Sequence, residues 1–221
     1  MTSSRLISLV QSPYTFSVSV FILWLTYVSV LVGMNFGYTQ WFISMTPLNQ
    51  LLCFILLMLN YPILNSRLGL VFLACFAIGF GAEQVGVHTG ILFGDYAYLH
   101  NFGPKFAGVP WLIGVNWALL AFITYGLCSA LPIPTFLQVM LGSLLMVLLD
   151  VLMEPLAPGF GFWAFSGNEV PVWNYICWFM VALPMHLILV KVRPEANRRL
   201  CAHLLAANFI FFITANVIHS S

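Results

Sequence analysis

Charged side chains are scarce in this sequence. Of its 221 residues, 6% are charged and 62% are hydrophobic, whereas about a quarter of the residues in an ordinary soluble domain are charged. This scarcity excludes a soluble globular protein. Seven Lys and Arg residues against six Asp and Glu residues give a net charge of +1, so the chain also lacks the basic surface that nucleic-acid binding requires. Together these absences indicate a protein whose solvent is lipid.

Long apolar segments fill most of the chain instead. A membrane-spanning helix needs about 20 apolar residues, and a lone strand could not satisfy its backbone polar groups in hydrocarbon, so each segment is predicted to be a helix. The sequence therefore predicts an all-α, polytopic membrane helical bundle that forms one domain over residues 1–221. Seven transmembrane helices are expected, at about 14–37, 48–64, 68–94, 110–131, 135–153, 172–191 and 198–218.

The few basic residues are distributed unevenly between these helices. In a seven-helix arrangement Lys105 falls alone on one side of the membrane. The other side receives Arg5, Arg67, Lys191, Arg193, Arg198 and Arg199. Since Lys and Arg in short loops tend to remain cytoplasmic, we expect the N-terminus inside and the C-terminus outside, in a multi-pass protein of the cell membrane.

Patterns typical of metal or redox sites are missing. The cysteines show no C-x-x-C spacing and are expected to be small buried thiols. They are Cys53, Cys75, Cys128, Cys177 and Cys201. The five histidines show no H-x-x-x-H or H-E-x-x-H pairing, and no nucleotide-binding or G-x-S-x-G motif occurs. The sequence therefore predicts neither a metal site nor a cofactor.

The acidic residues of the apolar segments are few enough to consider singly. A carboxylate in a membrane helix is costly unless it is paired, so each one indicates a partner or a function. Glu83 and Asp150 each lie about 22 Å along their predicted helices, so they are expected to face each other. His88 and Glu154 each lie about 30 Å along the same two helices. Asp150 and Glu154 share a helix face at i, i+4 spacing, and Asp95 lies at the outer end of the third helix.

Two interpretations fit these five polar groups. They could form an acid/base site in the outer half of the bundle, because two close carboxyl groups in a low dielectric cannot both ionise and one stays protonated as a general acid. Alternatively, they hydrogen-bond to one another and fix the helix register. The convergence of five groups from two helices favours the acid/base site. Of the remaining acids, Glu169 is expected in a loop and Glu195 among solvated charges.

A loop rich in aromatic residues follows each acidic helix. The loops contain Tyr96, Tyr98, Phe102 and Phe106, and Phe160, Phe162, Trp163, Phe165 and Trp173. Such rings form the interfacial belts of many membrane proteins. They could instead wall a pocket in which their π-faces stabilise a cation.

Small and amide side chains are expected to join the helices. Five glycines between Gly79 and Gly94 have the spacing that lets membrane helices approach closely. Asn116, Asn174 and Asn216 are expected to hydrogen-bond between helices, and Asn116 is the one expected to support the acids because it lies near the outer entry of its helix.

Several of these residues belong to motifs that resemble a known family. The motifs are EQVGVHTG from Glu83 to Gly90, FGDYAY from Phe93 to Tyr98, Gly108-Val109-Pro110, Asn116-Trp117 and Asp150-x-x-x-Glu154-Pro155. In these motifs the chain resembles the CruF-type carotenoid biosynthesis proteins from about Gly81 to Trp163. These are integral-membrane carotenoid 1,2-hydratases, similar to the bisanhydrobacterioruberin hydratases and to the γ-carotene or lycopene hydratases.

The resemblance implies a reaction and a set of roles. A cofactor-independent hydro-lyase would take a linear carotenoid of the lycopene, γ-carotene or C50 type from the bilayer and add water across its terminal double bond. Asp150 or Glu83 would donate the proton, and His88 or Glu154 would orient and deprotonate the water. Substrate binding is expected at Asp95, Tyr96, Tyr98, Asn116, Trp117, Phe162 and Trp163. Association with other carotenoid enzymes would fit this role.

Two other functions remain open at this point. A carotenoid end-group cyclase or isomerase protonates the same alkene but excludes water, and the sequence barely separates it from a hydratase. A proton-coupled transporter would use Glu83, His88 and Asp150 as a relay. The inner half of the predicted bundle has no acidic path, and the chain shows no duplicated halves, so an enzyme is favoured.

Overall fold

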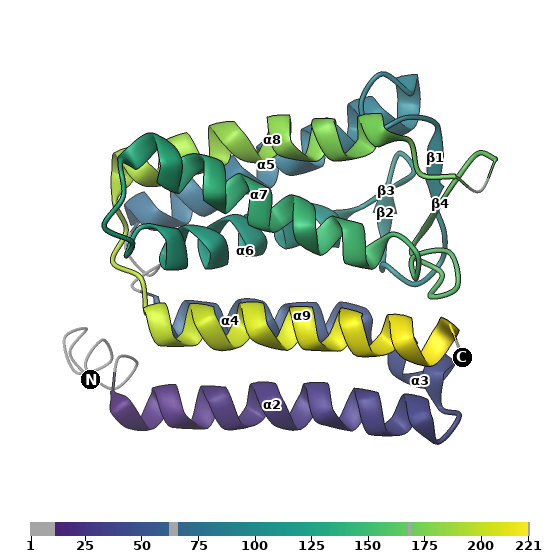
Figure 1. The fold of residues 1–221 in the computed structure, drawn as a ribbon, viewed down its shortest axis with the longest axis horizontal. Helices are drawn as coiled ribbons and strands as arrows, with labels where there is room; N and C mark the ends of the chain where they lie inside the picture. The colour runs from purple at the N-terminus through teal and green to yellow at the C-terminus, as the bar shows by residue number, and fades with distance from the viewer. Residues whose placement is uncertain (1–11, 62–65, 168, 221) are drawn as a thin grey trace.

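The computed structural model describes residues 12–61, 66–167 and 169–220, and eight helices account for most of these residues (Figure 1). They are α2 (Pro13–Asn35), α3 (Thr39–Ser44), α4 (Thr46–Asn60), α5 (Ser66–Thr89), α6 (Trp111–Cys128), α7 (Thr135–Met153), α8 (Val172–Val192) and α9 (Arg198–Ser220). Apart from α3 and α4, all are long and apolar enough to cross a membrane. The predicted all-α, polytopic membrane class is therefore confirmed.

The predicted segment 48–64 corresponds to α4, the shortest of the seven main helices. It has 15 residues, a length of about 22 Å against a hydrocarbon core of about 30 Å. The short helix α3 precedes it, and the chain turns between them at Met45. Residues 62–64 of the predicted segment lie outside the described part. The described part of the chain thus has six helices long enough to span a membrane and two shorter ones, α3 and α4.

The predicted third helix, 68–94, is too long at its outer end, because α5 ends at Thr89. Three of the next five residues have positive φ, with values of 66° at Gly90, 66° at Phe93 and 110° at Gly94. A left-handed residue stops an α-helix. The chain therefore turns after Thr89 and brings the first aromatic loop back over the end of the bundle.

The helices are arranged around a central group of four. Helices α5, α6, α7 and α8 pack against one another, and α9 packs on α6 and α7. Helix α2 packs on α9 at the edge of the molecule, and α4 contacts α2, α6 and α9 (Figure 1). The core of the central group is large and apolar, with Trp117, Phe122, Met146 and Met185 fully buried.

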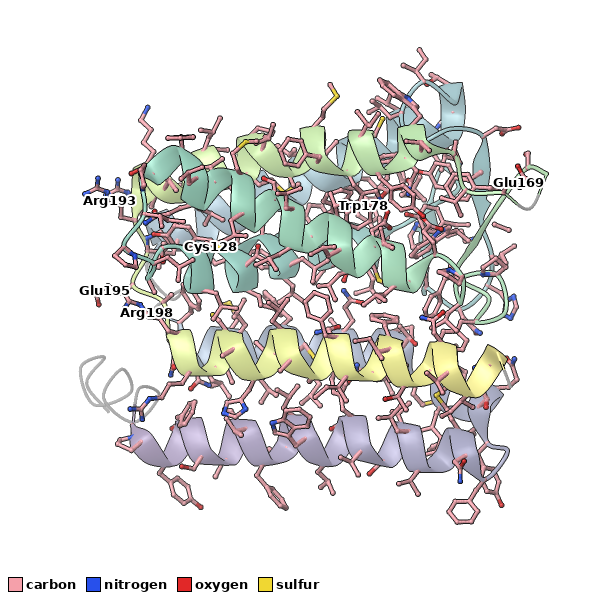
Figure 2. The ribbon with its side chains drawn as sticks, viewed as in Figure 1. Cys128, Glu169, Trp178, Arg193, Glu195 and Arg198 are labelled. Carbon is pink, nitrogen blue, oxygen red and sulfur yellow. The ribbon has the colours of Figure 1, made fainter. Side chains whose placement is uncertain are left out.

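The two ends of the bundle differ in charge and structure. Figure 2 shows Arg193, Glu195 and Arg198 at one end and Glu169 at the other. The start of α2 and the end of α9 lie at opposite ends of the bundle (Figure 1), as an odd number of passes requires. Which end faces the cytoplasm stays a prediction.

Two small sheets, which the sequence analysis did not predict, close the end opposite to Arg193 (Figure 1). Strand β1 (Tyr96–Tyr98) pairs antiparallel with β4 (Trp163–Phe165), and β2 (Lys105–Phe106) pairs with β3 (Val109–Pro110). Both β1 and β4 have the pattern aromatic-Ala-aromatic. Since alternate side chains of a strand point to opposite faces, the aromatic rings of both strands share one buried face.

The predicted buried thiols and interhelical amides are confirmed. All five cysteines are free and buried. Asn116 accepts a hydrogen bond from Gln50 Nε2 of α4 at 2.8 Å, and Asn216 of α9 donates to the Leu152 carbonyl of α7 at 2.8 Å. Asn174 of α8 donates to the acidic residues of α7, as described below.

Close packing joins α6, α7 and α8 at a buried histidine. The ring nitrogens of His186 lie 2.9 Å from Thr124 Oγ1 and 3.3 Å from Ser143 Oγ. A Cβ atom at Gly142 would lie only 2.4 Å from His186 Nε2, whereas a Cβ at Gly81 would meet nothing within 4 Å. The absence of a side chain at Gly142 is therefore a condition for this packing.

We predict that Gly142→Ala lowers the free energy of unfolding by about 1–3 kcal/mol, because the added methyl group forces the His186 ring out of place. Gly81→Ala is the matched control and should be neutral or stabilise the helix by up to about 1 kcal/mol. Unfolding in detergent micelles measures both. Equal stability of the two variants would contradict the packing described here.

Candidate active site

Glu83 is buried and accepts hydrogen bonds from three side chains. Tyr98 Oη donates to Glu83 Oε2 at 2.8 Å, and Tyr96 Oη donates to the same oxygen. Trp117 Nε1 donates to Glu83 Oε1 at 2.9 Å. All three donors belong to aromatic side chains. The Glu83 carboxyl group is therefore surrounded by apolar rings, of which only the hydroxyl and indole N–H groups are polar.

Glycines of α5 and the alternation of β1 create this shell. Tyr96 and Tyr98 point the same way because one residue separates them in a strand. A Cβ at Gly86 would lie 2.8 Å from Tyr96 Oη, and a Cβ at Gly79 would lie 2.4 Å from Trp117. The small residues thus let two of the three donors approach the helix that carries Glu83.

A pair of carboxyl groups at the end of α7, those of Asp150 and Glu154, is held by Asn174 of α8. Asn174 Nδ2 donates to Asp150 Oδ2 at 2.7 Å and to Glu154 Oε1 at 2.9 Å. Trp163 Nε1 of β4 donates to Glu154 Oε2 at 2.9 Å. Asp150 and Glu154 are both buried. The i, i+4 spacing therefore does place both acids on one face, where a single amide contacts both.

Glu83 and Glu154 both line a small cavity of about 10 Å³. It is lined by Glu83, Phe93, Tyr96, Tyr98, Ile113, Glu154, Trp163, Phe165, Asn174 and Trp178. A space of this size suits about one water molecule when polar groups surround it. Carboxyl, amide and phenol groups line the cavity, so it could hold water.

Aromatic rings enclose the acids on the remaining sides. Trp117 stacks on Trp178, with ring centroids 3.9 Å apart, and Trp178 lies within the bundle (Figure 2). Tyr98 and Trp163 meet edge to face across the β1–β4 pair at 6.1 Å. Of the rings that were expected to form either a belt or a pocket, Tyr96, Tyr98, Trp163 and Phe165 line the acidic cavity, whereas Phe106 and Trp173 are exposed.

The hydrogen bonds distinguish the carboxyl groups chemically. Three donors suit the ionised form of Glu83, which only accepts hydrogen bonds. Asp150 Oδ1, by contrast, is buried and has no hydrogen-bond partner in the described part of the chain. An oxygen in that setting suits a protonated carboxyl group. Two carboxyl environments that differ in this way are typical of acid/base pairs.

Groups just beyond the membrane-spanning helices have shifted pKa values. Burial raises the pKa of Glu154 from its ordinary value of 4.5 to about 7. Burial, followed by the charge of Glu83, raises the pKa of Tyr98 well above its ordinary value of 10.0. Tyr98 therefore remains a donor at neutral pH, while Glu154 exchanges its proton near neutrality.

Three residues predicted to act with the acids lie elsewhere. His88 is exposed, and its Nδ1 pairs with the Gln84 carbonyl of its own helix at 2.8 Å. His88 follows Glu83 by five residues of α-helix, so its side chain points about 140° away from that of Glu83 around the helix axis. Asp95 is exposed. Asn116 lines a different cavity, with Phe162, although it precedes Trp117 in the sequence.

Asn174 was predicted only to pair helices, and Trp178 was not among the predicted site residues. Both belong to α8, and their spacing of four residues places them on one helix face. That spacing, on an apolar helix near the acids, is the signal that could have identified them. Among the described residues, no three His, Cys, Asp or Glu side chains are grouped so that they could hold a metal ion.

The chain is similar to proteins of known families. The model of a family described as "Carotenoid biosynthesis protein" matches residues 16–221. The chain is 29% identical over 128 residues to the bisanhydrobacterioruberin hydratase of Haloarcula japonica, a match that covers 54% of this chain and 44% of the relative. The chain thus spans less than half the length of the curated relative that it matches. No solved structure matches it significantly.

We predict that protonation of Glu154 makes stability depend on pH. The folded-state pKa of about 7 lies above the ordinary 4.5, so the contribution of Glu154 is fully present below pH 4.5 and is lost as pH rises through about 7. Unfolding temperature measured from pH 5 to 8 should therefore fall less steeply in Glu154→Gln than in the wild type. The exposed acid Glu169 provides the control, because Glu169→Gln should keep the wild-type slope. Identical slopes in all three proteins would contradict the raised pKa.

Proposed function

This chain belongs to the carotenoid biosynthesis protein family, and from this premise we propose that it adds water across the terminal double bond of a linear carotenoid. The observation that carries the proposal is the water-sized cavity between Glu83 and Glu154, with Asp150 held beside it by Asn174. The name of the matched relative, a hydratase, supports the same reaction. The enzyme would work in the cell membrane, without a cofactor, on substrate dissolved in the bilayer.

The proton would come from the Asp150–Glu154 pair. Two buried carboxyl groups held by one amide favour a state in which they share a proton, and this proton passes to C2 of the alkene. The π-electron pair forms the new C2–H bond and leaves a tertiary cation at C1. The reaction therefore begins as general acid catalysis.

Water completes the reaction on the side of Glu83. The water oxygen bonds to C1, and its surplus proton passes to the Glu83 carboxylate. The number of protons on the protein is unchanged, and one water is consumed. The exposed position of His88 makes Glu83 the better base of the two, so the roles differ from those expected from the sequence.

The surroundings would stabilise the cation. Trp178 lines the small cavity and stacks on Trp117, so it offers a π-face, which attracts positive charge. The ionised Glu83 adds a negative charge in a site with little water, where electrostatic stabilisation is strongest. The polar lining of the small cavity favours a hydratase over a cyclase, because a cyclase must keep water away from the same cation.

Conversion of pigment in bacteria that accumulate lycopene tests the proposal. We expect extracts of cells that express this chain to contain a carotenoid heavier by one water, because the terminal alkene is hydrated. Mass spectrometry of the extracted pigment measures this. An isomer of unchanged mass would indicate cyclisation, and unaltered pigment would count against both reactions.

Substitution of the acids tests their roles. Asp150→Asn, Glu154→Gln and Glu83→Gln should each lower the conversion rate on the order of 10²-fold or more, because each removes a proton donor or acceptor. Glu169→Gln is the matched control, since this acid is exposed in a loop. Rates are compared at equal amounts of membrane-inserted protein. Wild-type rates in Asp150→Asn and Glu83→Gln would refute the assignment.

A further inference from the structure

A second and much larger cavity lies on the other side of α6 and α7 from the acids. Its volume is about 350 Å³, within the range of about 300–1,000 Å³ found for small-molecule sites. Helices α2, α3, α4, α6, α7 and α9 all contribute to its lining. Most of the lining side chains are aliphatic or aromatic, so the cavity suits an apolar ligand.

This cavity reaches the surface of the bundle beside α3 and α4. Trp41 of α3 and Leu48 of α4 line it and are 60% and 63% exposed. Large apolar side chains at the surface of a helical membrane protein suit contact with lipid. A ligand dissolved in the bilayer could therefore enter between α3 and α4 without crossing water.

Aromatic side chains from the two loops separate the cavity from Glu154 at its outer end. Phe102 and Phe162 line the cavity, and their ring centroids lie 6.1 and 6.0 Å from that of Trp163. Trp163 in turn donates its indole hydrogen bond to Glu154.

Helix α7 contributes residues to both the large cavity and the acidic cluster. Leu149 and Met153 line the cavity, whereas the residues that follow each of them, Asp150 and Glu154, belong to the acidic cluster. An apolar chain lying in the cavity would therefore end beside the acids.

The cavity also contains an unused hydrogen-bond acceptor. Asn49 lines it, and Asn49 Oδ1 is buried with no partner among residues that the structure describes. A buried acceptor without a donor is destabilising. An unhydrated carotenoid chain has no donor, and neither does the acyl chain of a phospholipid, so this acceptor does not select between them. The continuity of the cavity with the acid-bearing end of α7 is the observation that favours a carotenoid as the occupant.

We propose that this cavity binds the isoprenoid chain of the carotenoid and that the terminal alkene reaches the acids past Phe102 and Phe162. The inference rests on the proposed function, because it takes the carotenoid as the substrate of the acid cluster. It adds the place of the substrate chain, which the acid cluster itself has no room to hold.

Tryptophan substitutions that fill the cavity test this inference. Val30 of α2 and Leu52 of α4 line the cavity. Val28 and Leu51, on the same two helices, are 51% and 42% exposed and face outward. We expect Val30→Trp and Leu52→Trp to lower both bound lycopene per protein and the hydration rate by about tenfold or more, because the indole occupies the space of the ligand. Val28→Trp and Leu51→Trp should match the wild type in both measurements.

Purified protein in detergent, loaded with lycopene and freed of unbound pigment, provides the binding measurement by absorbance. Elution volume and unfolding temperature establish that each variant is folded. The two cavity substitutions lie on different helices, so if one variant fails to fold, the other still tests the inference. Wild-type pigment binding in a folded cavity variant would overturn the inference, even if that variant had lost co-purifying phospholipid. A wild-type protein that binds no pigment would overturn it as well. Pigment binding that depends on the cavity, without any hydrated product, would uphold the cavity and refute the proposed reaction.

Discussion

The cost of placing carboxyl groups inside an apolar bundle is the constraint on which this structure depends. Glu83, Asp150 and Glu154 are almost entirely removed from solvent, and a buried charge or acceptor is tolerated only when other groups hydrogen-bond to it. The donors come from four separate elements: Tyr96 and Tyr98 from β1, Trp117 from α6, Trp163 from β4 and Asn174 from α8. The bundle, the turn after α5 and the β1–β4 pair are all needed to bring these donors together.

Helical periodicity accounts for what the sequence could predict. Hydropathy alone located the seven main helices to within a few residues, apart from the outer end of α5, because hydrocarbon demands long apolar runs. The rise per residue placed Glu83 and Asp150 at similar depth, and the i, i+4 rule joined Asp150 to Glu154. The same arithmetic failed for His88. Depth along a helix axis says nothing about direction around it, and His88 points away from the acids.

Contacts between distant segments could not be predicted in this way. Strand β1 pairs with β4 across two intervening helices, and three residues of alternating pattern are too short to mark a strand against a background of apolar sequence. The role of Asn174 depends on the packing of α8 against α7, which no local pattern specifies. The large cavity likewise arises between six helices. Its lining residues have ordinary spacings in each helix, and only their assembly reveals the space.

The separation of the two cavities follows from the chemistry that each must accommodate. Water needs polar neighbours, so its space is small and lined by carboxyl, amide and phenol groups. A polyene needs apolar surface and a path from the bilayer, and under the proposed function the large cavity beside α3 and α4 would provide both. Were the two spaces continuous, water would enter the apolar cavity or lipid would cover the acids. Phe102 and Phe162 lie between the large cavity and Trp163, whose indole donates to Glu154, so in the proposed reaction the terminal alkene would have to pass these rings. The hydrogen bonds of Tyr98 and Trp163 hold Glu83 and Glu154 in place beside this boundary.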